Sequence, residues 1–116
     1  MRKVYFDNNA TTPVHPVVAE FAKPFLGEFF GNPSSLHWAG REVRCFFNDA
    51  REQAANMIHA QPSEIVFTGC GSESDNHAVK GLAYAKRDEG RHIITTMIEH
   101  PAVLNACKHL QADGYD

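Results

Sequence analysis

The residues best suited to chemistry lie between a short apolar run and a segment with helical spacing. The apolar run covers 65–67, and the stretch 68–76 follows it directly with the sequence Thr-Gly-Cys-Gly-Ser-Glu-Ser-Asp-Asn. Its two glycines, Gly69 and Gly71, let the backbone turn sharply, and the first N–H groups of a helix have no partner within the helix. A glycine turn between a strand and a helix suits a phosphate, although the same pattern also occurs in proteins that bind no ligand.

The polar side chains of this stretch have competing interpretations. Ser72 can donate its hydroxyl to a phosphate, or it can cap the helix by accepting the N–H of Asp75. Glu73 and Asp75 suit the positive end of a helix dipole but repel an anion, so we expect both to point away from it. Cys70 has no His or Lys beside it in the sequence, and a small buried turn residue is the favoured interpretation over a nucleophile.

His100 follows a second apolar run, 92–98. If both runs are parallel strands, His100 emerges at the same edge of the sheet as the glycine turn. A histidine in that place can stack on a cofactor ring or exchange protons near neutral pH. The alternative is a structural histidine whose ring nitrogens bind nearby backbone.

Composition limits the class of protein. The chain has 116 residues, of which 43% are hydrophobic and 22% charged, and its formal net charge is -3. These values predict a folded domain without the basic surface that nucleic acids or anionic membranes require, and the cytoplasm is the default compartment. Three widely spaced cysteines and seven histidines without a paired spacing predict neither a disulfide framework nor a metal site.

Apolar periodicity predicts alternating elements. We expect an extended segment over 1–15, and then helices over 16–29 with a bend at Pro24, 36–58, 72–87 and 101–110. Strands are expected over 64–68 and 92–98. This order predicts an α/β layer with parallel strands, in which binding residues lie at the carboxyl ends of the strands.

Four segments, in order, carry a resemblance to a known family: 5–13, 30–35 with His37, 68–76 and 98–103. Together they resemble the pyridoxal-phosphate-dependent cysteine desulfurases of the NifS/IscS type, within the aminotransferase class V group. The resemblance implies the N-terminal part of the large domain of a type I pyridoxal-phosphate transferase, similar to aspartate aminotransferase, with an incomplete sheet. The implied organisation is an N-terminal extended segment, 1–15, and a truncated cofactor-binding domain, 16–116.

The resemblance also implies roles for individual residues. Gly71 and Ser72 are expected to hold the cofactor phosphate, through a backbone N–H and a hydroxyl. His100 is expected to stack on the pyridine ring and to move protons, and Asn9 and Ala10 are expected near the substrate entrance. Ser72 stands where threonine is usual in the family, which preserves the hydroxyl.

The implied reaction converts L-cysteine to L-alanine and passes the sulfur on as an enzyme persulfide. The expected partners are a second copy of the chain in a homodimer, and a sulfur acceptor or scaffold protein, for iron–sulfur cluster assembly or another sulfur-using synthesis. The Schiff-base lysine and the sulfur-accepting cysteine are expected beyond Asp116, in the remainder of the enzyme. The 116 residues alone are therefore expected to be inactive.

Two alternatives remain open on sequence grounds. The chain could be a stand-alone, non-catalytic module that packs on a partner or binds a phosphate ligand through 69–72. It could also belong to a class V enzyme that acts on selenocysteine or another amino acid, because substrate choice depends on residues outside the chain.

Overall fold

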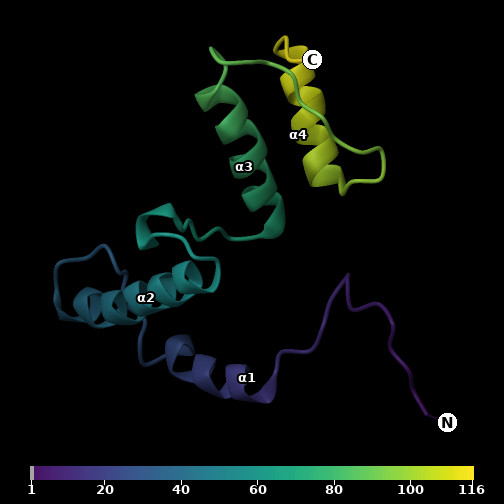
Figure 1. Ribbon diagram of the computed structural model, residues 1–116. Coiled ribbons are helices and arrows are strands. Elements are labelled where there is room, and N and C mark those ends of the chain that lie inside the picture. Colours follow the sequence, from purple (N-terminus) through teal and green to yellow (C-terminus); the bar gives the residue numbers. More distant parts are fainter. Residues whose placement is uncertain (1) are drawn as a thin grey trace. The chain divides into compact units, whose positions relative to one another are not determined.

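In the computed structural model, which describes residues 2–116, the chain divides into two units, Met1–Ile65 and Val66–Asp116. Figure 1 shows the helices of both units. The helices are α1 Pro16–Ala22, the 3₁₀ helix η1 Lys23–Leu26, α2 Trp38–Met57, the 3₁₀ helix η2 Pro62–Glu64, α3 Gly71–Ala85 and α4 Pro101–Ala112. The helices predicted over 36–58, 72–87 and 101–110 are confirmed, with ends shifted by at most two residues, whereas the one predicted over 16–29 ends at Ala22.

The first helix of unit 1 does not continue through Pro24. It ends at Ala22, and the chain tightens into η1, where the Pro24 carbonyl accepts the N–H groups of Gly27, Glu28 and Phe29. Proline has no N–H and crowds the preceding turn, so the predicted bend becomes a helix end.

Phenylalanine side chains join η1 to α2. The Phe25 ring lies edge-on to Phe46 of α2, with centroids 5.2 Å apart, and it also contacts Phe21 and Phe29. Tilted and edge-on rings at this spacing are favourable aromatic pairs. Phe25 and Phe29 therefore pack against α2, whereas Phe21 is 70% exposed.

Two glycines let the loop 31–36 lie against the start of α2. A Cβ on Gly40 would come within 2.5 Å of the Ser35 carbonyl oxygen, and one on Gly31 would overlap the backbone of Ala39. Arg44 fixes the same loop by donating to the carbonyls of Pro33 and Ser35, at 2.7 and 3.0 Å. The loop is thus held by backbone contacts that a larger residue at either glycine would disrupt.

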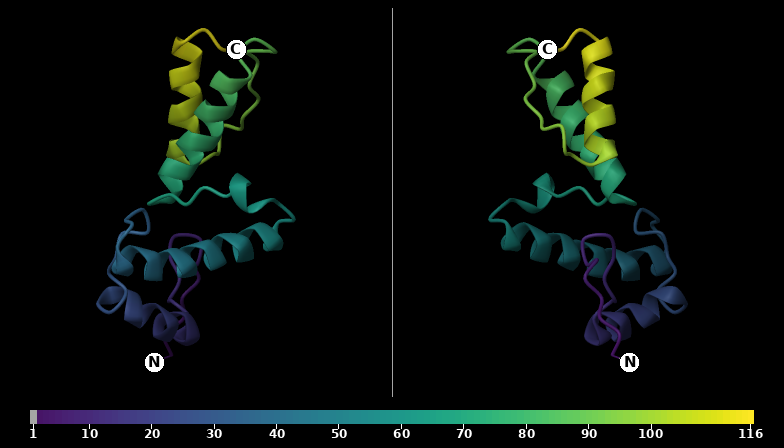
Figure 2. Two further views of the ribbon diagram at one scale, coloured as in Figure 1. Left: turned by 90° about the vertical axis from the view of Figure 1, so that its left-hand side faces the viewer. Right: turned by 90° about the vertical axis from the view of Figure 1, so that its right-hand side faces the viewer.

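In unit 2, α3 and α4 pack side by side and are connected by the segment 86–100 (Figures 1 and 2). Its buried apolar side chains are Ala106, Leu110 and Tyr115, of which Leu110 is 0% exposed. The Tyr115 hydroxyl donates to the Ala83 carbonyl of α3 at 2.9 Å. This small core joins the two helices along their carboxyl-terminal halves.

The predicted strands 64–68 and 92–98 are not formed within the described residues, so the expected incomplete sheet is not confirmed. A strand needs a ladder of partners, and only the start of the second segment has one. There the Arg91 carbonyl accepts the Asp116 N–H at 2.8 Å, and the Asp116 carbonyl accepts the Ile93 N–H at 2.7 Å. These two bonds form the pattern of a single parallel bridge, so the predicted strand direction survives at one residue pair.

The rest of this apolar segment is exposed. Ile94, Met97 and Ile98 are 88%, 92% and 94% exposed. Such side chains favour a pleated, half-buried surface, which residues 2–116 do not supply here. Among residues 2–116, no helix is both long and apolar enough to cross a membrane.

Candidate cofactor site

The start of α3 lies at the predicted glycine turn. The helix begins at Gly71 with Cys70 as its N-cap, and the Cys70 side chain makes no capping hydrogen bond. A Cβ placed on Gly71 would meet nothing within 4 Å, so the space beside this residue is open. Within residues 2–116, the N–H groups of Gly71 and Ser72 and the Ser72 hydroxyl donate no hydrogen bond. Ser72 therefore does not cap the helix, and its hydroxyl remains available to a ligand.

Side chains of the same stretch order the turn. Glu73 Oε2 accepts the Gly69 N–H at 2.7 Å. Thr68 Oγ1 donates to the Cys70 carbonyl at 3.2 Å and lies 2.5 Å from Ser74 Oγ. The expectation that Glu73 points away from the turn is therefore wrong, because its carboxylate compensates for an N-cap residue that has no capping oxygen.

Cys70 is exposed rather than buried, and so is Cys45, whereas Cys107 on α4 is partly buried. The favoured interpretation of Cys70 as a buried turn residue is therefore wrong. Its place at the N-cap explains the exposure, because an N-cap side chain projects from the end of the helix.

His100 is the N-cap of α4. Its Nδ1 accepts the Ala102 N–H at 3.2 Å, and Pro101 occupies the first helical position. The ring thus performs the structural role considered for it, and it does so with one nitrogen only. His15 caps α1 in the same way, since its Nδ1 accepts the Val17 N–H at 3.3 Å ahead of Pro16.

The helices α3 and α4 run in the same direction. Tyr84, in the last turn of α3, contacts Asp113, the C-cap of α4, so the carboxyl-terminal ends of the two helices lie together. Both views in Figure 2 agree with Figure 1 that the two helices begin at the opposite end of the unit. Gly71, Ser72 and His100 therefore lie at the same end of unit 2, although the sheet edge predicted to bring them together is not formed within residues 2–116.

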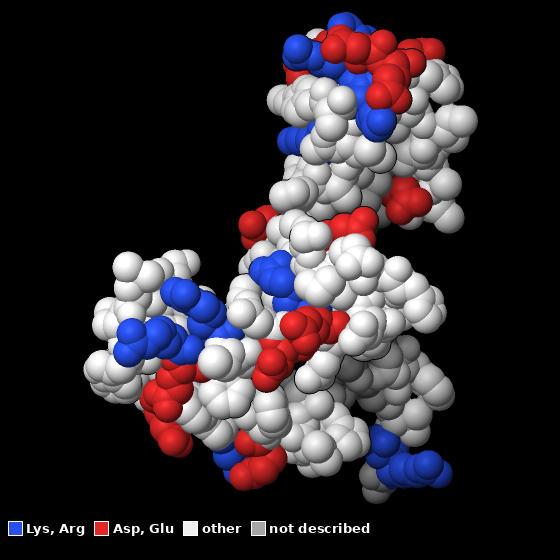
Figure 3. Space-filling model, turned by 60° about the vertical axis from the view of Figure 1, so that its left-hand side comes forward, with Lys and Arg blue, Asp and Glu red and all other residues white. Residues whose placement is uncertain are grey.

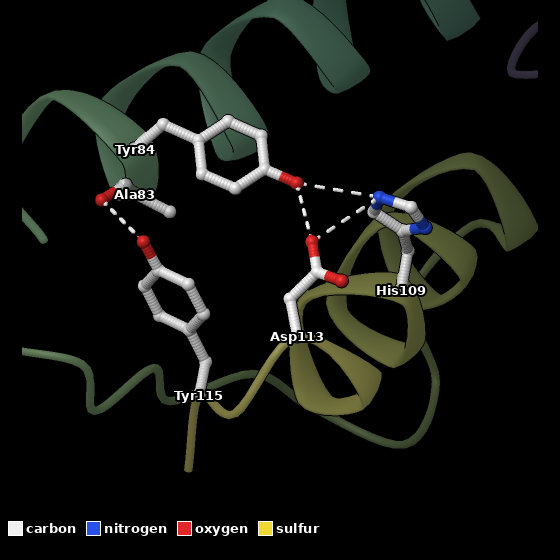
Figure 4. A network of polar contacts seen from close by, with 5 residues as sticks. All are labelled: Ala83, Tyr84, His109, Asp113 and Tyr115. Atoms are coloured by element: carbon white, nitrogen blue, oxygen red, sulfur yellow. Dashed lines mark hydrogen bonds and ion pairs between the residues drawn. The ribbon is translucent and has the colours of Figure 1, made fainter.

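A polar cluster fixes this alignment (Figure 4). The Tyr84 hydroxyl donates to Asp113 Oδ2 at 2.7 Å, and His109 Nε2 lies 3.3 Å from the Tyr84 oxygen and 3.6 Å from the Asp113 oxygen. The hydrogen bond to Asp113 raises the pKa of Tyr84, and desolvation and the carboxylate charge add to the effect. The sequence alone does not reveal this cluster, because no local motif links residues 29 positions apart.

Charged side chains of both signs gather at the end of unit 2 where α3 and α4 finish, and acidic side chains also lie near the helix starts (Figure 3). The charges where the helices finish include the pairs Lys86 with Glu89 and Arg87 with Asp88. Mixed charges of this kind form a solvated surface and do not attract polyanions. Across residues 2–116, no three His, Cys, Asp or Glu side chains gather in a way that could hold a metal ion.

Asn9 and Ala10 belong to unit 1, so their position relative to α3 is not defined. They lie in an exposed turn in which the Ala10 N–H donates to the Asp7 carbonyl at 3.2 Å. The Tyr5 hydroxyl closes this turn by donating to the carbonyls of Asp7 and Thr11, at 2.8 and 3.0 Å. The structure thus gives both residues an ordered setting within the segment 1–15.

Comparison with known proteins identifies the family. Residues 4–116 match the aminotransferase class-V family. The chain belongs to this family. Among its class-V relatives, a cysteine desulfurase of Trichormus azollae is 51% identical over 115 residues, and the cysteine desulfurase IscS of Methanosarcina thermophila is 49% identical over 115 residues. Each alignment covers 99% of this chain and 28% of the relative.

Two solved structures have the same fold. A NifS-like protein superposes with a TM-score of 0.89 at 44% identity, over 99% of this chain and 32% of that one. DndA from Streptomyces lividans gives a TM-score of 0.77 at 40% identity, over 97% of this chain and 32% of that one. The chain spans less than a third of the length of these relatives, and the matching parts of the NifS-like protein and of DndA share its fold.

Proposed function

We propose that this chain is the N-terminal part of a pyridoxal-phosphate-dependent cysteine desulfurase, which converts L-cysteine to L-alanine and transfers the sulfur through an enzyme persulfide. The observation that carries the proposal is the start of α3, where the N–H groups of Gly71 and Ser72 have no partner within residues 2–116. His100 lies at the same end of unit 2. The relatives that match the whole chain at about half identity are named cysteine desulfurases.

The residues at the start of α3 fit a phosphate. Phosphate oxygens accept hydrogen bonds, and this turn offers two backbone N–H donors, one hydroxyl and the positive end of a helix dipole. The open space beside Gly71 lets an anion approach the backbone closely. We therefore assign the phosphate of the cofactor to Gly71 and Ser72.

His100 would cover the pyridine ring of the cofactor with its imidazole face. Because Nδ1 accepts the Ala102 N–H, a neutral His100 carries its proton on Nε2. Nε2 is the atom that we propose exchanges a proton near the substrate. Pyridoxal phosphate, when bound, supplies an electron sink that weakens bonds at the α-carbon of an amino acid.

The remaining reactive groups are assigned to residues outside this chain. Four lysines of this chain lie on helices or at a helix end, not at the end of a strand where the Schiff-base lysine is expected: Lys23, Lys80, Lys86 and Lys108. Lys23 and Lys86 are paired with Glu20 and Glu89. We therefore propose that the 116 residues bind part of the cofactor and are inactive alone.

The proposed whole enzyme is a cytoplasmic homodimer that takes L-cysteine as substrate and delivers sulfur to an acceptor or scaffold protein. Within it, 1–15 would form an extended segment with Asn9 and Ala10 near the substrate entrance, and 16–116 would form the first part of the cofactor-binding domain. The exposed apolar side chains at Ile94, Met97 and Ile98 favour this assignment over a stand-alone module, because a stable module would bury them.

Amino-acid analysis of the complete native protein tests this proposal. After incubation with pyridoxal phosphate and L-cysteine, the protein should release L-alanine and carry a persulfide that a thiol reagent can trap. The 116-residue chain alone should form no alanine. Release of alanine from selenocysteine but not from cysteine would instead identify a selenocysteine lyase, and no product from either would contradict the proposal.

A further inference from the structure

Glu73 makes a contact that the assignment of Gly71 and Ser72 does not require. Its carboxylate reaches back over the start of α3 and accepts the Gly69 N–H at 2.7 Å. A helix that begins with Ser, Thr, Asp or Asn is ordinarily capped by that residue, whose side-chain oxygen takes the N–H of the second or third helical residue. Cys70 has no such oxygen and makes no such bond.

The difference between the two kinds of cap decides which donors remain for a ligand. An ordinary cap on α3 would occupy the N–H of Ser72 or Glu73, which lie at those two positions. Glu73 instead bonds the N–H of Gly69, which precedes the N-cap, and leaves the N–H groups of Gly71 and Ser72 without a partner in the described structure. The turn is thus ordered without loss of the donors that a phosphate needs.

Gly69 suits this contact. A Cβ at this position would lie 3.3 Å from Glu73 Oε2, which is tighter than most such contacts, so the absence of a side chain gives the carboxylate room. Thr68 and Ser74 also support the turn, through the contact between their hydroxyl oxygens at 2.5 Å.

We propose that Glu73 is a positioning residue that orders the 68–72 turn from its Gly69 side and so presents the N–H groups of Gly71 and Ser72 to the cofactor phosphate. This inference rests on the proposed function, since it takes pyridoxal phosphate as the ligand. The length of the Glu73 side chain, which brings its carboxylate to the Gly69 N–H, is what orders the turn. Its charge opposes the binding of a phosphate dianion.

Two single substitutions separate the effect of the length of the Glu73 side chain from the effect of its charge. Glu73→Gln keeps an acceptor oxygen at the same distance along the side chain and removes the charge. Glu73→Asp keeps the charge and shortens the side chain by one methylene, so its carboxylate cannot reach the Gly69 N–H from the same backbone. Both variants are expected to fold, because Asp and Gln are tolerated in the first turn of a helix.

The experiment measures the dissociation constant of pyridoxal phosphate for the complete native protein by fluorescence, and the deuterium exchange of the peptide that contains 68–72. We expect Glu73→Asp to weaken binding about tenfold and to speed exchange, and Glu73→Gln to bind as tightly as the wild type or up to severalfold more tightly. Unchanged binding by Glu73→Asp, or weakening by Glu73→Gln to the same extent, would overturn the positioning role. Ser72→Ala, measured in parallel, distinguishes this failure from that of the proposed function. Unchanged binding in that variant would contradict the assignment of the cofactor phosphate to the start of α3.

Discussion

Tyr84 of α3 donates a 2.7 Å hydrogen bond to Asp113 at the end of α4, and this contact aligns two helices that are far apart in the sequence. Because the helices are parallel, a contact at their carboxyl ends brings their starts to a common end as well. Those starts carry Ser72 and His100, which are proposed to contact the phosphate and the pyridine ring of one cofactor. The contact thus supports the candidate site from the opposite end of unit 2.

The same contact predicts a loss of stability at high pH. The pKa of Tyr84 is raised in the folded state, so the folded chain holds the phenol proton more tightly than the unfolded chain does. The stabilisation is complete below the unfolded pKa of about 10 and is lost as the pH rises through the higher folded value. Urea unfolding should show wild type more stable than Tyr84→Phe at pH 8, with the difference shrinking above pH of about 10. A difference that does not depend on pH would contradict this prediction.

Leu110 should dominate the core of unit 2. Its side chain is 0% exposed between α3 and α4, so Leu110→Ala should lower the free energy of unfolding by about 2–5 kcal/mol. Lys108→Ala, at an exposed position on the same helix, is the matched control and should change it by less than about 0.5 kcal/mol. Equal effects of the two substitutions in urea titrations would show that Leu110 does not support this core.

Two glycines within helices should respond to alanine with opposite signs. Gly40→Ala brings a Cβ against the carbonyl oxygens of Ser35 and Asn32, at 2.5 and 2.6 Å, and should destabilise by about 1–3 kcal/mol. Gly81→Ala meets only the His77 ring at 3.8 Å and should stabilise by about 0.5–1 kcal/mol, because alanine favours the helix. Thermal unfolding of both variants checks the prediction, which fails if the signs agree.

The cap and cofactor roles of His100 should be separable. Asparagine is a strong N-cap residue without an imidazole ring, so His100→Asn should preserve the melting temperature and weaken pyridoxal phosphate binding roughly three- to tenfold. His15→Asn changes the equivalent cap of α1 and should leave cofactor binding unaltered. If both variants bind the cofactor as wild type does, His100 serves the helix alone.

Most of the helices and the position of the glycine turn could be predicted from the sequence because both depend on local patterns. The helix expected over 36–58 is observed as Trp38–Met57, and the turn begins α3 at Gly71. The strands predicted over 64–68 and 92–98 are not formed within residues 2–116, where 92–98 finds a backbone partner only in Asp116. Strand pairing depends on residues distant in sequence, whereas helix bonds are satisfied within four residues.

The direction of the Glu73 side chain at the candidate site was predicted wrongly from charge alone. Charge alone predicts that Glu73 turns away from an anion site, and the structure instead places its carboxylate on Gly69. The signal that favours this contact is the acidic residue at the third helical position, which is half of a capping box. Its importance depends on the missing cap at Cys70, which the sequence shows only once the helix start is known.

The dissociation constant of pyridoxal phosphate for Ser72 variants of the complete native protein tests the central claim most directly. A hydrogen bond to a charged phosphate contributes about 1.5–3 kcal/mol, so Ser72→Ala should weaken binding roughly 10- to 100-fold. Ser72→Thr keeps the hydroxyl and should bind as wild type does, within about threefold. Equal affinity of wild type and Ser72→Ala would contradict the assignment of the cofactor phosphate to the start of α3.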